Sequence, residues 1–168
     1  LDGFFAKQSA SAIIQFAKDR ASGAHVQLKE LKLMVMGQAA VGKTTLVRCL
    51  RREAFNPKIL STDGIELGRI QLGNITFVTW DFGGQKVYRY THQLFLTSNA
   101  IYLLLFKVTD PPSVSINELA FWINSLTARS SSSSSTKVML LATHCDRASR
   151  LQLESHPREV FQALSELY

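Results

Sequence analysis

The stretch Gly37-Gln-Ala-Ala-Val-Gly42-Lys43-Thr44 follows the pattern G-x-x-x-x-G-K-[ST], and the sequence on either side of it suits that pattern. The mostly apolar run 31–36 before it indicates a buried strand, and the segment 45–52 after it indicates a helix. Between a strand and a helix, the N–H groups of such a loop and the positive helix end converge on an anion. The sequence therefore predicts a phosphate-binding loop, and with it a nucleotide-binding protein.

Each residue type in this loop has a role beside a phosphate. Gly42 lets the backbone approach without a Cβ in the way. Lys43 adds a positive charge against the β- and γ-phosphates, and the Thr44 hydroxyl can ligate Mg²⁺. The residues predicted to hold the phosphates are Gly37, Gln38, Ala39, Ala40, Val41, Gly42, Lys43, Thr44 and Thr45.

Length and composition indicate an ordinary globular domain. The chain has 168 residues, of which 46% are hydrophobic and 19% charged. No apolar run reaches the roughly 18 residues that span a membrane, and no secretory signal is visible. The first residue is Leu1 rather than methionine, so the expectation is a fragment of a longer protein.

Cysteine content and charge narrow the choice of compartment and partner. Two cysteines, Cys49 and Cys145, are too few for a disulfide framework and favour reduced thiols in a cytoplasmic protein. The net charge is +6, but no aromatic residues interleave with the arginine clusters near 48–52 and 147–150. A nucleic-acid partner is therefore not expected.

Strand and helix patterns alternate along the chain. Alternating residues at 65–72, a Gly73-Asn74 turn and the run 75–80 predict an antiparallel hairpin. The whole predicts an α/β fold: a mostly parallel sheet flanked by helices, with one antiparallel edge strand. Further strands are expected at 100–106 and 138–143, helices at 7–21, 87–96, 113–128 and 158–167, and loops at 53–63 and in the serine run 130–135.

A second motif, Trp80-Asp81-Phe82-Gly83-Gly84-Gln85, follows an apolar strand. An aspartate at the end of a strand beside the phosphate loop can hold Mg²⁺, commonly through water. The N–H of Gly84 can contact a γ-phosphate, and Gln85 is placed to orient an attacking water. This motif predicts a loop that detects the γ-phosphate, with Gln85 and Lys43 as the catalytic residues.

A third motif, Thr143-His144-Cys-Asp146, ends the strand at 138–143. A carboxylate there can accept two hydrogen bonds, from the N1–H and the exocyclic amine of guanine. Adenine has no such donor pair, so Asp146 favours guanine. On its own, Asp146 is equally well explained as a turn or cap residue. Because the two preceding motifs occur in the appropriate order and spacing, the guanine-binding role is favoured.

Taken together, these motifs resemble the Ras-type GTPases, and in detail the Roc (Ras-of-complex) domain of Roco proteins. The run 81–85 followed by Tyr88, Thr91-His92 and 95–97 is similar to the Roc pattern, and His144 replaces the lysine of most small GTPases. The run 61–66 resembles the Roc switch I. The resemblance covers about residues 32–167 and implies a P-loop, Ras-like fold.

The resemblance also implies roles and neighbours. Thr62 would coordinate Mg²⁺ when GTP is bound, although an ordinary loop hydroxyl is the alternative. Residues 1–28 would connect to preceding repeats, and 29–168 would form the Roc domain, with a COR dimerisation domain, effectors and a possible dimer as partners. Compared with a Ras-like domain, the last strand and helix are expected to be missing after Tyr168.

The predicted function is a guanine-nucleotide switch that hydrolyses GTP with Mg²⁺. No arginine lies just before Thr62, where Lys58 is the only cation between Phe55 and that threonine, so hydrolysis should be slow without a partner that supplies an arginine. That lack also leaves open an alternative, a nucleotide-binding dimerisation or scaffold module with little hydrolysis. An ATPase is disfavoured by Asp146.

Overall fold

A computed structural model describes residues 30–59, 61–85, 89–97, 99–128 and 137–167. The helix predicted at 7–21 and the serine run 130–135 lie outside these ranges, so both stay predictions. The same holds for the predicted boundary between a connector and a GTPase domain at 28/29.

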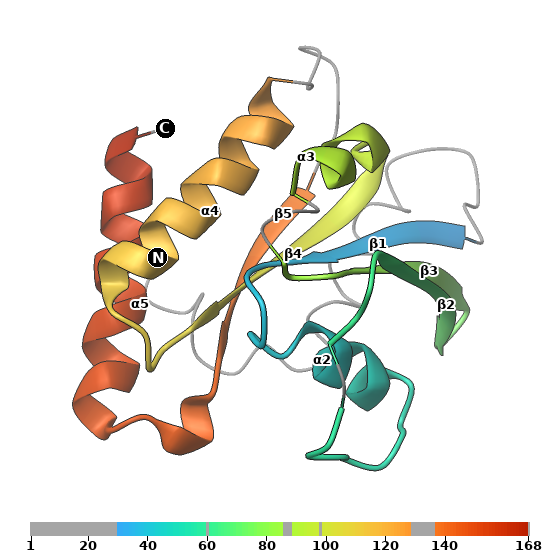
Figure 1. The fold of residues 1–168 in the computed structure, drawn as a ribbon, viewed down its shortest axis with the longest axis horizontal. Helices are drawn as coiled ribbons and strands as arrows, with labels where there is room; N and C mark the ends of the chain where they lie inside the picture. Colours follow the sequence, from blue (N-terminus) through green and yellow to red (C-terminus); the bar gives the residue numbers. More distant parts are fainter. Residues whose placement is uncertain (1–29, 60, 86–88, 98, 129–136, 168) are drawn as a thin grey trace.

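Five strands form one mixed sheet in the order β2-β3-β1-β4-β5 (Figure 1). β1 runs parallel to both β3 and β4, and β4 runs parallel to β5, whereas β2 and β3 pair antiparallel. The α/β fold with one antiparallel edge strand is thereby confirmed. The strands are β1 (Glu30–Met36), β2 (Ile65–Leu72), β3 (Ile75–Phe82), β4 (Ala100–Lys107) and β5 (Lys137–Thr143).

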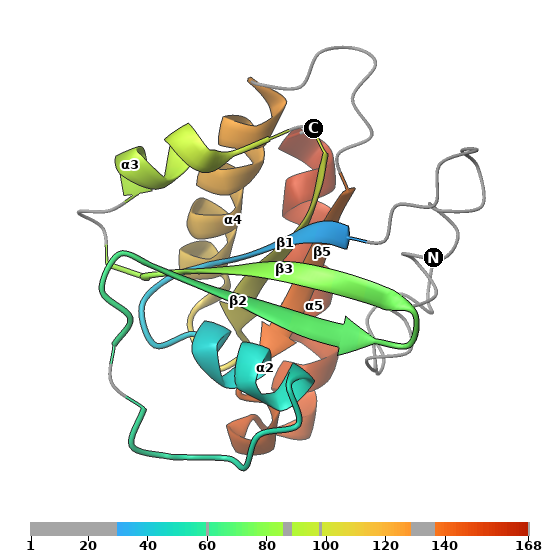
Figure 2. The ribbon, with the colours of Figure 1, turned by 90° about the vertical axis from the view of Figure 1, so that its right-hand side faces the viewer.

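Helices cover both faces of this sheet (Figures 1 and 2). The helix α2 (Lys43–Leu50) packs on one face, and α4 (Pro112–Thr127) and α5 (Arg150–Leu167) lie side by side on the other. Alternate residues of β1 pack against the helices on opposite faces of the sheet, because successive side chains of a strand point to opposite faces. Leu33 and Val35 belong to the cluster with α2, whereas Met34 and Met36 pack with Trp122 of α4 and its neighbours.

Two helices differ from their predicted bounds. α5 begins at Arg150, eight residues before the predicted start at 158. An interior proline removes a backbone hydrogen bond, but the structure keeps this helix continuous through Pro157 and buries the ring. In the predicted helix at 87–96, the described part forms only α3 (Arg89–His92) and a 3-10 turn, η2 (Gln93–Phe95).

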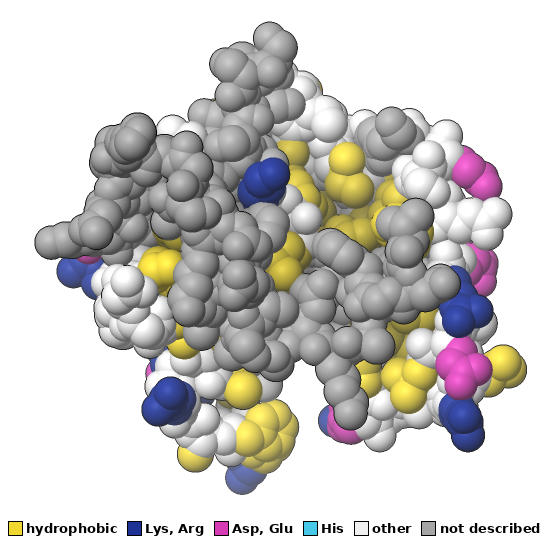
Figure 3. Space-filling view, turned by 180° about the vertical axis from the view of Figure 1, so that it is seen from behind, with side chains coloured by type: hydrophobic (Ala, Val, Ile, Leu, Met, Phe, Trp, Pro, Cys, Tyr) yellow, Lys and Arg dark blue, Asp and Glu magenta, His cyan; other side chains and the backbone are white. Residues whose placement is uncertain are grey.

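The surface mixes charged and apolar side chains. In the view from behind, acidic and basic side chains both lie along the right-hand edge, and hydrophobic side chains are exposed on the same face (Figure 3). Among the described residues, no helix combines the length and the apolar character that crossing a membrane requires.

Candidate functional site

The loop between β1 and α2 is shaped by two glycines with positive φ. Gly37 has φ 144°, and a Cβ there would lie 2.6 Å from the carbonyl oxygen of Leu105 in β4. Gly42 has φ 96° and precedes the first residue of α2. Both positions need glycine, the first for close packing and the second for a left-handed turn. The loop therefore turns sharply at both ends and presents the start of α2 at the carboxyl edge of the parallel strands.

Lys43 is folded back over this loop. Its Nζ donates to the carbonyl oxygens of Gly37 (2.9 Å) and Gln38 (2.8 Å), and the residue is 6% exposed. Burial lowers the pKa of Lys43 to about 8, although the carboxylates of Asp81 and Glu118 favour the charged form. The partly desolvated ammonium of Lys43 would therefore interact strongly with an anion bound above the loop.

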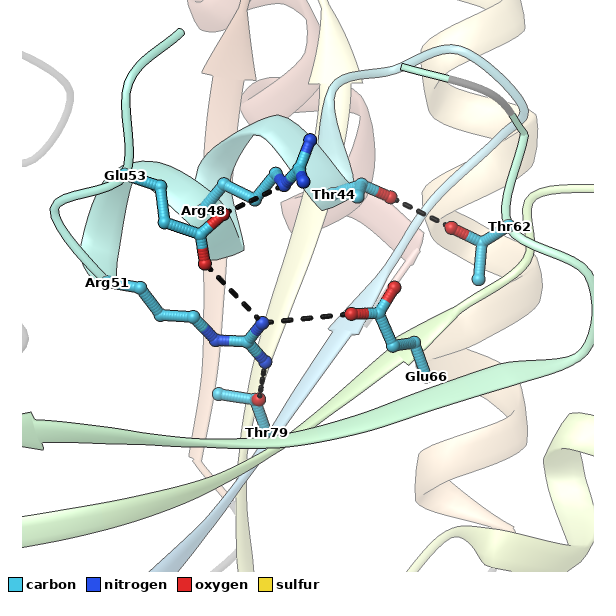
Figure 4. A network of polar contacts seen from close by, with 7 residues as sticks. All are labelled: Thr44, Arg48, Arg51, Glu53, Thr62, Glu66 and Thr79. Carbon is cyan, nitrogen blue, oxygen red and sulfur yellow. Dashed lines mark hydrogen bonds and ion pairs between the residues drawn. The ribbon is translucent and has the colours of Figure 1, made fainter. Parts of the chain in front are cut away.

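Thr44, Thr62 and Asp81 approach one another beside Lys43. The two threonine hydroxyl oxygens lie 2.9 Å apart (Figure 4). Asp81 is 1% exposed at the end of β3, and neither carboxylate oxygen has a hydrogen-bond partner within the described part of the chain. Burial raises its pKa, while the nearby Thr44 hydroxyl, Lys43 and Arg51 act in the opposite direction. A buried carboxylate without donors is costly, and a bound cation would relieve that cost.

This donor set fits Mg²⁺. The ion prefers hard oxygen ligands and is usually held by one or two carboxylates, waters and substrate phosphates rather than by a full protein cage. One carboxylate and two hydroxyls match that requirement. No group of three or more His, Cys, Asp or Glu gathers anywhere in the described ranges, so these residues alone make no closed metal cage.

The loop after β3 packs directly on the phosphate loop. A Cβ on Gly84 would lie 2.5 Å from the Cα of Ala39 and 2.6 Å from Lys43 Nζ. Gly83 donates its N–H to the carbonyl oxygen of Gly64 (2.8 Å), which joins this loop to the segment carrying Thr62. The loop at Gly84 therefore contacts Lys43 on one side and is hydrogen-bonded to the segment that carries Thr62 on the other.

The motif after β5 forms the other end of the site. The Thr143 hydroxyl donates to the carbonyl oxygen of Phe106 (3.0 Å), and His144 adopts a left-handed backbone, φ 57°. Burial lowers the pKa of His144, which keeps its ring neutral near pH 7, and Lys107 and Arg147 add to the shift. The Asp146 side chain is 78% exposed, and its Oδ2 lies 3.9 Å from Arg147 Nε in a solvent-exposed ion pair, so the carboxylate is accessible to a ligand.

These parts enclose a cavity of about 670 Å³. Residues from all three sequence motifs meet there, although the motifs lie far apart in the chain. The predicted site residues that line it are Ala39, Ala40, Val41, Gly42, Lys43, Thr44, Thr45, Thr62, Gly84, Thr143, His144 and Asp146.

Four predicted residues do not line that cavity. Asp81 lies buried beside Thr44, and Gly37 offers its carbonyl to Lys43. Gln38 and Gln85 line a second cavity of about 420 Å³, on the side of Gly84 toward α4. The structure thus separates Gln85, the residue predicted to orient water, from the main cavity.

Further residues line the main cavity without having been predicted for it. They come from the helix α2, from the loop before β2 and from positions beside the motifs: Leu46, Cys49, Phe55, Asn56, Pro57, Ile59, Ser61, Phe82 and Arg147. The Asn56-Pro57 pair, which marks a turn, was the signal that the loop folds back toward α2.

Comparison with known proteins decides the family. The family model "Ras of Complex, Roc, domain of DAPkinase" matches residues 32–146, more than half of the chain. The chain belongs to the Roc family. Roc is a Ras-like GTPase domain, and that membership implies guanine-nucleotide binding.

Relatives of this Roc domain are mostly large kinases. It is 38% identical over 138 residues to a probable serine/threonine-protein kinase, roco11, from Dictyostelium discoideum, covering 75% of this chain and 9% of the relative. Over 131 residues it is 32% identical to leucine-rich repeat serine/threonine-protein kinase 1 from Caenorhabditis elegans, covering 70% of this chain and 5% of the relative. ADP-ribosylation factor-like protein 8b from Arabidopsis thaliana is 24% identical over 90 residues, with 54% and 49% covered. The chain thus spans under a tenth of the kinases, in which the Roc domain sits among other domains.

Proposed function

We propose that this Roc domain binds GTP and GDP in the 670 Å³ cavity and hydrolyses GTP slowly to GDP. The observation that carries the proposal is the meeting of the phosphate loop, the loop at Gly84 and the Asp146 motif around one cavity. The phosphates would lie on the loop N–H groups at the start of α2, and the base would lie against Asp146.

The chain's own residues would divide the work as follows. Lys43 would release its bonds to the loop carbonyls and turn toward the β- and γ-phosphates. Thr44, Thr62 and Asp81 would hold Mg²⁺, which neutralises the charge that develops on the transferred phosphoryl group. Gly84 would meet the γ-phosphate and sense its presence, because its Cα already lies against Lys43 and Ala39.

Gln85 would orient the water that attacks the γ-phosphate in line. In the structure Gln85 lines the second cavity, which adjoins the main cavity at Ala39 and Gly84, so its side chain would reorient toward the γ-phosphate for this role. Slow hydrolysis follows from that displacement and from the absence of an arginine in the run before Thr62.

A second candidate function is favoured by the same position of Gln85. A Roc domain whose Gln85 stays in the second cavity would bind nucleotide to maintain an assembly with neighbouring repeat and COR domains, in a dimer or with effectors, and would hydrolyse little. In this alternative the bound nucleotide stabilises the assembly and is hydrolysed little.

Phosphate release from GTP under single-turnover conditions with Mg²⁺ distinguishes the two. We expect slow release that falls at least about tenfold in Gln85→Leu, because water is no longer oriented. Gln162→Leu, a change on the exposed side of α5, is the matched control and should leave the rate unchanged. Equal rates in wild type and Gln85→Leu would favour the structural reading.

A further inference from the structure

Arg51, at the end of α2, joins three elements through one guanidinium group (Figure 4). Its Nη2 donates to the hydroxyl of Thr79 on β3 (3.2 Å), and its Nη1 lies 3.8 Å from Glu53 and 3.7 Å from Glu66. The Arg51 side chain is 20% exposed and Thr79 is fully buried. A long cationic side chain is therefore held inward, at a cost in side-chain entropy that its contacts must offset.

The strand β2 is shaped to receive this group. A Cβ added at Gly68 would lie 1.7 Å from Arg51 Nη2 and 2.7 Å from its Cζ, so the guanidinium lies directly on the backbone of the strand. Gly68 pairs with Thr79 across the hairpin, which places both contacts at one level of the sheet. Glycine inside a strand weakens it, and a close approach of this kind is one reason for it to be there.

The two acidic partners of Arg51 stand at opposite ends of one loop. Glu53 precedes residues 54–64, and Glu66 follows them at the start of β2. This loop carries Thr62, whose hydroxyl meets that of Thr44, and its residues Phe55 and Ile59 line the nucleotide cavity. Arg51 therefore closes the base of the loop that forms one wall of the candidate site.

We propose that Arg51 is a positioning residue, which fastens both ends of loop 54–64 to α2 and thereby keeps that loop over the nucleotide cavity. Neither the phosphate-loop motif nor the Asp81 motif includes this residue. Fixing the ends of a loop removes part of the entropy that drives it open. We call Arg51 with its partners Glu53, Glu66 and Thr79 the Arg51 clasp. An effect of this clasp on nucleotide retention rests on the proposed function, whereas its effect on the position of loop 54–64 does not.

The first test needs no nucleotide. Lys58 is the only lysine or arginine in residues 54–64, so trypsin cleavage after Lys58, followed by mass spectrometry, reports opening of the loop. We expect Arg51→Gln to raise this cleavage rate about two- to fivefold, the loss expected for partly exposed ion pairs. Arg150→Gln is the control and should leave the cleavage rate unchanged, because Arg150 is 94% exposed on α5 and pairs with Glu154 of the same helix.

Two further variants distinguish a specific effect of the Arg51 contacts from nonspecific destabilisation of the fold. Gly68→Ala keeps every charge and displaces the guanidinium, which the added methyl would meet at 1.7 Å, with the Thr79 hydroxyl next at 3.1 Å, so it should raise cleavage as Arg51→Gln does. Glu66→Gln changes a half-exposed carboxylate and remains informative if Arg51→Gln does not fold. Wild-type cleavage after Lys58 in folded Glu66→Gln and Gly68→Ala would overturn the proposal.

The second test measures dissociation of a fluorescent GDP analogue with Mg²⁺ present. Arg51→Gln and Glu66→Gln should each speed dissociation about two- to fivefold, and their double variant should be no faster than the faster single. Strictly additive effects would mean that the two residues act separately and would contradict the clasp. A wild-type protein that retains no GDP would contradict the proposed function instead, and the cleavage experiment would still decide whether Arg51 closes the loop.

Discussion

The hydroxyl oxygens of Thr44 and Thr62 lie 2.9 Å apart, although 18 positions separate the two residues in the chain. This contact joins the start of α2 to the loop before β2, beside the buried carboxylate of Asp81. A divalent ion bound here would take both hydroxyls as ligands and would hold the loop to the phosphates. With such an ion bound, the position of the loop would be coupled to the nucleotide through Thr62.

Thr62→Ala should weaken binding of GTP with Mg²⁺ by about tenfold or more, the scale on which metal sites respond to altered ligands and their supports. GDP binding should change less, since the γ-phosphate is what brings the ion and this loop together in the proposed mechanism. Calorimetric titration with GDP and with a non-hydrolysable GTP analogue measures both. Thr127→Ala on the exposed side of α4 serves as the control.

Gly84→Ala should abolish the discrimination between GTP and GDP. The added methyl would lie 2.5 Å from the backbone of Ala39, which cannot yield as a flexible side chain would. The loop after β3 must then stand away from Lys43, and the N–H of residue 84 no longer reaches a γ-phosphate. Similar GTP and GDP affinities in the variant support this account; a preference for GTP equal to that of wild type would count against it.

Leu103→Ala should lower the free energy of unfolding by about 2–5 kcal/mol, because the cavity it leaves is closed in by neighbours that relax only in part. Leu103 is fully buried in the middle of β4. Leu151, 74% exposed on α5, is the matched position, and Leu151→Ala should change that free energy by less than about 0.5 kcal/mol. Urea unfolding followed by circular dichroism compares the two variants.

His156 makes stability depend on pH. It is 3% exposed and stacks on Phe106, with its Nε2 3.2 Å from the Ser115 hydroxyl. Burial lowers its pKa, although the carboxylates of Glu159 and Asp110 act in the opposite direction.

Because the folded pKa lies below the unfolded value of about 6.5, the unfolded chain binds more protons between the two values. The free energy of unfolding should therefore be flat above about pH 6.5 with respect to this residue, and fall as the pH drops from about 6.5 to the folded pKa. Urea unfolding between pH 7 and 5 should show a shallower fall in His156→Gln than in wild type. An equal fall in both proteins would show that His156 does not contribute.

Much of the fold follows from local sequence patterns. The hairpin strands were predictable because Gly73-Asn74 separates two alternating runs, and β4 because Ala100–Phe106 is wholly apolar. The start of α5 at Arg150 was not, since a proline such as Pro157 is unfavourable inside a helix by local rules, whereas the folded chain keeps the helix continuous and packs it against α4. Tertiary contacts decide such cases, and a single sequence does not display them.

The site was predictable where a motif fixes backbone geometry. The glycines of the phosphate loop and the strand end before Asp81 bring their residues together with no long-range information. The place of Gln85 could not be foreseen, because it depends on how Gly84 packs against Ala39. The Arg51 contacts were equally hidden, since they join residues from α2, β2 and β3 that no short pattern connects.

Calorimetric titration of the nucleotide-free protein with GDP and with ADP, each with Mg²⁺, tests the central claim most directly. The account predicts GDP binding at least about a hundredfold tighter than ADP binding, because Asp146 accepts two hydrogen bonds that only guanine donates. Asp146→Ala should remove that preference while leaving the fold intact, as its side chain is largely exposed. Equal affinity for the two nucleotides in wild type, or a preference for ADP, would contradict the assignment of the cavity as a guanine-nucleotide site.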